Sequence, residues 1–144
     1  MEALIGQGVL DAGKAVDGPG ALNARRLDKS DIYAAGELKH GTISLIEEGT
    51  FVIGVLTQSN LYEKTLSNLV ETRARGAYLM ALTSFGNYAI EDTADFVVYV
   101  PKINELFAAS LAVVPLQLLG YYVSCARGLD VDKPRNLAKS VTVE

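Results

Sequence analysis

Three short apolar runs lie in the middle of the chain, and each predicts a β-strand. They are rich in β-branched and aromatic residues and lack the polar alternation of a strand with one solvated face. A nearly continuous apolar run of this length is typical of a strand buried on both faces. The predicted strands are residues 51–57, 77–83 and 96–100.

Helical patterns lie before, between and after these runs. Apolar residues at helical spacing follow Asn60, whose position three residues before Glu63 resembles a capping box. A longer apolar stretch begins after Asn104, contains Pro115, which should kink it, and stops before Gly128. The predicted helices are 32–40 capped by Asp31 and ended by Gly41, 43–48 capped by Thr42, one from Asn60 to Arg75, and one from Asn104 to Arg127.

This order of elements predicts an α/β fold, a three-layer sandwich in which helices cover both faces of a parallel sheet. Three strands alone would leave apolar sheet edges open, and such edges are normally paired or covered. Either the segment before Asp31 supplies another strand, or another subunit or domain covers the edge.

Composition divides the chain into three parts. Residues 1–30 are rich in glycine and match the pattern poorly: residues 3–5 could form a short strand, or the segment could be a helix, a tail or unrelated coding sequence. Residues 31–128 carry the regular α/β pattern. Residues 129–144 form a charged tail that either frays or docks on a surface, and docking would bring Lys139 to a cleft.

Composition and charge exclude several classes of function. The chain has 144 residues, 49% of them hydrophobic, and a net charge of −4, which excludes a strongly basic nucleic-acid-binding protein. A single cysteine, Cys125, excludes an internal disulfide and a cysteine-based zinc site, and a single histidine, His40, excludes a histidine-rich metal site.

The apolar stretch at residues 106–123 raises the question of a membrane span. It is interrupted by Ser110, Pro115, Gln117 and Gly120, and a span needs about 20 mostly apolar residues. We therefore expect a helix buried in the protein core, with Cys125 buried on it. The N-terminus lacks the basic and apolar regions of a signal peptide, so we expect a cytoplasmic protein without a membrane partner.

The densest polar cluster is the segment 33–41, YAAGELKHG. On a helix, Glu37 and His40 share a face. Histidine titrates near neutrality, so His40 could perform acid–base chemistry. The alternative is a surface helix end where cationic residues complement the helix dipole.

Two loops that follow predicted strands are further candidates, at residues 57–60 and 83–87. Backbone N–H groups and hydroxyls at such strand ends can bind an anion or a sugar phosphate. The alternative is simple helix capping.

Two segments carry a family resemblance. YAAGELKHG and the C-terminal stretch VVPLQLLGYYVSCARGLDVDKPRNLAKSVTVE, residues 113–144, resemble the end of glutamine–fructose-6-phosphate aminotransferases, and PRNLAKSVTVE is very specific to them. The resemblance runs from about residue 32 to 144 and implies the second sugar-isomerase (SIS) lobe, an α/β sandwich of flavodoxin-like type.

In this family, glutamine supplies ammonia that converts fructose 6-phosphate into glucosamine 6-phosphate, and the resemblance implies no metal and no organic cofactor. It assigns sugar ring opening to His40, acting across a dimer interface. It assigns the isomerisation to Lys139, beside the open-chain carbonyl, and places Ala138 in the same site.

The chain also departs from the family pattern. The proton-shuttling glutamate that the family carries on a helix before the histidine is unmatched, because Ala24 stands at the corresponding distance and Arg26 just beyond it. The glutaminase domain and the first SIS lobe, which holds most sugar-phosphate contacts, are absent. The resemblance therefore implies a lobe that is inactive alone and joins a homodimer or a first SIS lobe. The alternative is a non-catalytic module for phosphosugar binding or dimerisation.

Overall fold

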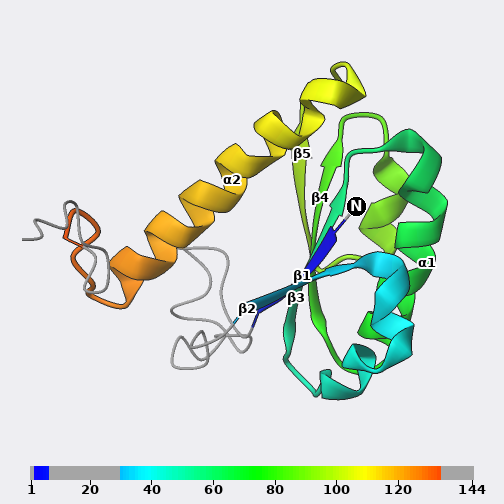
Figure 1. Cartoon of the computed structure of the whole chain (residues 1–144), viewed down its shortest axis with the longest axis horizontal. Coiled ribbons are helices and arrows are strands. Elements are labelled where there is room, and N and C mark those ends of the chain that lie inside the picture. The colour runs from blue at the N-terminus through cyan, green and yellow to red at the C-terminus, as the bar shows by residue number, and fades with distance from the viewer. Residues whose placement is uncertain (1, 7–29, 134–144) are drawn as a thin grey trace, which may run out of the picture.

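The computed structural model describes residues 2–6 and 30–133, which form a five-stranded sheet with α1 on one face and α2 on the other (Figure 1). The strand order is β2-β1-β3-β4-β5. The predicted three-layer α/β sandwich is confirmed. Its elements are β1 (Glu2–Gly6), β2 (Ser30–Ala34), η2 (Ala35–His40), η3 (Thr42–Leu45), β3 (Phe51–Leu56), η4 (Ser59–Leu61), α1 (Tyr62–Arg73), β4 (Tyr78–Ser84), η5 (Tyr88–Asp92), β5 (Phe96–Val100) and α2 (Glu105–Ala126), where η marks a 3₁₀ helix.

The three predicted strands are confirmed as a parallel unit. Strands β3 and β4 pair in parallel with Ile53 opposite Met80, and β4 and β5 pair in parallel with Leu82 opposite Val98. Five of the six residues of β3 are buried. Their apolar run is thus explained by a central position in the sheet.

The other edge of the sheet differs from the prediction. Strand β1 pairs antiparallel with both β2 and β3, so the sheet is mixed. Of the alternatives for the N-terminal segment, the strand is the one found, at Glu2–Gly6. The predicted helix 32–40 is wrong over its first turn: Ile32 pairs with Leu4 of β1, and the remainder is a 3₁₀ helix. The backbone hydrogen bonds that β2 forms with β1 therefore outweigh the helical pattern of apolar residues in this segment.

The core on the α1 face is closely packed. Leu69 of α1 and Leu79 of β4 are fully buried in one apolar cluster. Gly54 of β3 lies beneath Leu69, and a Cβ atom at residue 54 would come within 2.3 Å of Leu69 Cδ1. The absence of a side chain at Gly54 therefore lets the helix approach the sheet.

The α2 face is covered less completely, contrary to the predicted core helix at 106–123. Only Ala108 and Ala112 of α2 are buried, and Cys125 is exposed, so its predicted burial is wrong. Among the described helices, α2 has the length and composition of a membrane span, and 11% of its most apolar window is buried. Within the described chain, one sheet face cannot cover a helix that is apolar all round.

The predicted ends of α2 are confirmed. Asn104 Oδ1 accepts a hydrogen bond from the Leu106 amide at 3.0 Å. At the other end Gly128 adopts φ +68°, and the amides of Gly128 and Leu129 bond back to Cys125 and Ser124, which is the Schellman arrangement. The predicted capping box at Asn60 and Glu63 is wrong: a 3₁₀ turn precedes α1 and no side chain caps it.

Candidate functional site

His40 is the last residue of η2 and is exposed to solvent. The buried side chains of Ala35 and Leu38 anchor this short helix to the fold. Gly41 then adopts φ +147°, which a residue with a side chain rarely adopts, and so turns the chain into η3. Because side chains three apart eclipse in a 3₁₀ helix, Glu37 and His40 lie on the same exposed face.

The preceding residue, Lys39, forms an ion pair that links η2 to α1. Lys39 Nζ lies 2.6 Å from Glu71 Oε1, and about half of the lysine side chain is exposed. Such a pair contributes little to stability, but it fixes the direction of the lysine relative to its neighbour His40. Lys39 is therefore ion-paired to α1, whereas no such pair involves His40 among the described residues.

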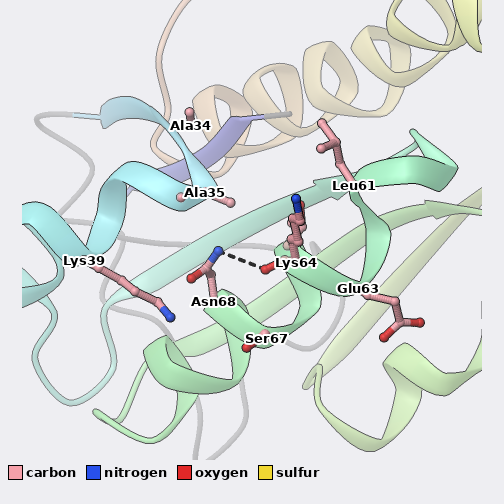
Figure 2. A pocket seen from close by; sticks show the side chains of 10 residues that line it. Ala34, Ala35, Lys39, Leu61, Glu63, Lys64, Ser67 and Asn68 are labelled. Atoms are coloured by element: carbon pink, nitrogen blue, oxygen red, sulfur yellow. Dashed lines mark hydrogen bonds between the residues drawn. The ribbon is translucent and has the colours of Figure 1, made fainter.

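A cavity of roughly 640 Å³ lies between η2 and α1 (Figure 2). Its wall combines small apolar residues of β2 and η2 with polar side chains of α1, among them the buried Asn68, whose Nδ2 donates to the Lys64 carbonyl at 2.9 Å. Cavities of this size can hold a small molecule. The lining residues are Ala34, Ala35, Gly36, Lys39, Leu61, Glu63, Lys64, Thr65, Ser67 and Asn68.

Sequence reasoning missed the α1 part of this cavity. Lys64 and Asn68 are four residues apart, so they share a face of the helix, but nothing in the sequence showed that η2 would pack beside that face. His40 itself is outside the cavity lining.

In the loop after β3, both donors of Ser59 are engaged. The amide and the hydroxyl of Ser59 both donate to Glu105 Oε1 of α2, at 2.9 and 2.5 Å. These hydrogen bonds hold the pKa of Glu105 below its ordinary value. The predicted anion-binding loop thus receives a carboxylate of the chain itself.

In the loop after β4, side chains bind one another and neighbouring strands. Thr83 donates to the Leu56 carbonyl and accepts from Asn87, at 2.9 Å in each case. Phe85 stacks on Tyr99 at a ring separation of 5.4 Å. Partial burial and the hydrogen bond to Glu91 raise the pKa of Tyr99 to about 12, so the phenol stays protonated at neutral pH.

Two of the predicted site residues, Ala138 and Lys139, lie outside the described residues. Their proximity to His40 stays a prediction.

The Ser59–Glu105 contact leads to a pH prediction. A lowered pKa means that ionised Glu105 stabilises the fold above its ordinary pKa of 4.5, and that this contribution is lost as pH falls through the lowered value. We expect Glu105→Gln to be less stable than the wild type at neutral pH, and the difference to shrink on acidification below 4.5. Urea unfolding of both proteins across this range measures it, and a difference that does not change with pH would contradict the assignment.

Comparison with known proteins places the chain in a family. The model of the SIS domain matches residues 29–127. The glutamine–fructose-6-phosphate aminotransferase of Caldanaerobacter subterraneus is 51% identical over 140 residues, which is 97% of this chain and 23% of that enzyme. The Clostridium acetobutylicum enzyme is 49% identical with the same coverage. The chain therefore spans about a quarter of the length of these relatives.

The extent of the match corrects one expectation. Because 97% of the chain aligns, the similarity reaches into the segment before Asp31 and does not begin near Ile32. This finding speaks against an unrelated origin for that segment.

A solved structure agrees with the sequence relatives. The C-terminal domain of the glucosamine-fructose-6-phosphate aminotransferase of Francisella tularensis matches with a TM-score of 0.61 and 33% identity, over 69% of this chain and 28% of that chain. The chain belongs to the SIS domain family and is homologous to the C-terminal SIS domain of glutamine–fructose-6-phosphate aminotransferases.

Proposed function

We propose that this chain is the C-terminal isomerase lobe of an enzyme that makes glucosamine 6-phosphate from fructose 6-phosphate and glutamine. The observation that carries this proposal is the 51% identity to such an enzyme over nearly the whole chain. On this proposal the chain works in the cytoplasm and needs no cofactor or metal.

His40 is the proposed acid–base group for opening the sugar ring. Ring opening moves a proton between the hemiacetal hydroxyl and the ring oxygen, which an imidazole can do near neutral pH. The exposed position of His40 at the end of η2 supports a role in a site completed by another subunit.

Lys139 is the proposed partner of the open-chain carbonyl, with Ala138 lining the same site. An amine there can form a Schiff base or stabilise negative charge that develops on the carbonyl oxygen. Because these residues belong to the C-terminal tail, closure of the tail would exclude water from the reaction.

The isolated chain is proposed to be inactive. The amide and hydroxyl of Ser59, in the loop after β3, are bound to Glu105, and no glutamate lies between Glu2 and Glu37 to shuttle the proton. On this proposal the phosphate contacts come from a first SIS lobe and the ammonia comes from a glutaminase domain, and neither lies within these 144 residues.

A chimera tests the proposal. This chain replaces the matching 140-residue segment of the Caldanaerobacter enzyme, once unchanged and once with Ala24→Glu to restore a carboxylate. We expect no glucosamine 6-phosphate from the chain alone and measurable product from at least one chimera, abolished by Lys139→Ala. Turnover by the chain alone, or folded chimeras that both lack activity, would refute it.

The cavity beside η2 supports a second candidate, a non-catalytic module that binds a phosphosugar. Lys64 lines it and could attract a phosphate, whereas Lys39, which also lines it, is paired with Glu71. Calorimetry of the isolated chain with fructose 6-phosphate separates the candidates. The isomerase lobe should bind no tighter than millimolar without its phosphate-binding partner, whereas micromolar binding that Lys64→Ala removes would favour the module.

A further inference from the structure

The cavity between η2 and α1 has one wall that combines a cation with buried polar side chains. Lys64, Thr65 and Asn68 of α1 all line it, and residues three and four apart lie on the same side of a helix. Thr65 is 3% exposed and Asn68 is 8% exposed, whereas Lys64 is exposed to solvent. This wall therefore has neutral polar groups in the interior and a cation at its rim.

The buried polar groups have hydrogen-bonding capacity that the described residues leave unused. Asn68 Nδ2 donates to the Lys64 carbonyl, but within residues 2–6 and 30–133 no donor reaches Asn68 Oδ1. The hydroxyl of Thr65 has no hydrogen-bond partner within the same ranges. Because buried polar groups are nearly always hydrogen-bonded, these two side chains favour a ligand that both donates and accepts, as a hydroxyl group does.

Lys64 is the lysine of this cavity that is available to bind an anion. No ion pair involves Lys64 among the described residues, whereas Lys39 is paired with Glu71. The carboxylate of Glu63 also belongs to the lining, but Figure 2 shows it extending away from Lys64. A single unpaired positive charge suits a ligand with a single negative charge, because further negative charge would lack a counter-ion.

The opposite wall of the cavity is apolar and formed by small residues. Ala34, Ala35 and Gly36 follow one another where β2 ends and η2 begins. A Cβ atom added at Gly36 would meet no atom within 4 Å, so there is free space beside this wall. The carbon skeleton of a ligand can lie there, as is usual in small-molecule sites with an apolar lining and a few polar groups.

We propose that this cavity binds a small sugar acid, a compound with one carboxylate and several hydroxyl groups. The carboxylate pairs with Lys64 Nζ, hydroxyl groups bond to Thr65 Oγ1 and Asn68 Oδ1, and the C–H groups of the sugar lie against the apolar wall. Side chains at this helical spacing have Cβ atoms about 5–6 Å apart, a span that one sugar ring bridges. This inference goes beyond the proposed function, because His40 lies outside the cavity lining.

Charge favours a carboxylate over a phosphate ester as the anionic group. A phosphate monoester carries a charge of about −1.5 to −2 at neutral pH, and Lys64 balances only one unit of it. A second cation would have to come from Lys39, whose Nζ lies 2.6 Å from Glu71 Oε1. A carboxylate needs no such rearrangement.

An NMR titration of the isotope-labelled full chain with sodium glucuronate at neutral pH tests the proposal. We expect saturable amide shifts around the cavity and a Kd of about 1 mM or tighter, the affinity of a modest ligand of this size. Lys64→Ala and Thr65→Val should each weaken binding about 5–20-fold, because each removes one polar contact. Glucose, which is uncharged, should bind at least about 10-fold more weakly than glucuronate.

Two further variants serve as controls. Lys102→Ala removes an exposed lysine outside the cavity lining and should leave the Kd unchanged. Gly36→Leu places a side chain in the free space beside the small-residue wall and should abolish saturable binding. Circular dichroism checks that each variant is folded. Should a substitution at the buried Thr65 prevent folding, Lys64→Ala still decides the question, since Lys64 is exposed.

Four outcomes would overturn the proposal: no saturable binding of glucuronate, a Kd that Lys64→Ala leaves unchanged, glucose binding as tightly as glucuronate, or fructose 6-phosphate binding more tightly than glucuronate. The last result would favour the phosphosugar module. None of these measurements involves turnover. Inactive chimeras would therefore refute the proposed function without bearing on this site.

Discussion

Replacing His40 with alanine in the active aminotransferase chimera is expected to lower kcat by about 10²–10⁴-fold, the usual contribution of a positioned acid–base group. The imidazole would act on the proton that moves during ring opening, a step after substrate binding. We therefore expect KM to change little while kcat falls. Steady-state formation of glucosamine 6-phosphate measures both constants.

The matched control is Glu47→Ala, which removes an exposed side chain from the same part of the chain, outside the proposed site. It should keep wild-type kinetics. If His40→Ala stayed within about twofold of the wild-type kcat, the proposed role of His40 in ring opening would be wrong.

The largest expected effect on stability comes from Leu79→Ala, which should lower the free energy of unfolding by about 2–5 kcal/mol. Leu79 is fully buried in β4, a strand paired on both sides. Its side chain packs in the cluster with Leu69 and Val52. Truncation would remove apolar contacts and leave a cavity that a central strand cannot close by moving.

Leu45→Ala is the control for this loss, because Leu45 is 64% exposed and the same chemical change there should stay within about 0.5 kcal/mol. Urea unfolding at one protein concentration compares the two variants and keeps any self-association equal. If both variants lost the same free energy of unfolding, burial of Leu79 in the described core would not be a main source of stability.

The sequence predicted the parallel unit because its signals are local. An uninterrupted apolar run such as Phe51–Leu56 has few alternatives to a central strand. The ends of α2 were predicted for the same reason, since Asn104 and Gly128 act on backbone groups within one turn. The family was also readable from the chain, because the aminotransferase resemblance rests on contiguous residues.

Contacts between distant segments were beyond local reasoning. The pairing of Ile32 with Leu4 turned a predicted helical turn into a strand. The hydrogen bonds from Ser59 to Glu105 join residues 46 positions apart. They engage the donors of Ser59 in a loop that the sequence predicted to bind an anion. The cavity beside η2 depends on how that helix lies against α1, and no spacing in the sequence encodes it.

By itself, the sequence determined which segments are the parallel strands, where α2 begins and ends, and to which family the chain belongs. Only the tertiary structure decided that the sheet is mixed, that Glu105 accepts hydrogen bonds from Ser59, and that most of α2 is exposed. The physical reason is that the hydrophobic effect is not directional: an apolar residue favours burial, but its identity does not specify which surface covers it.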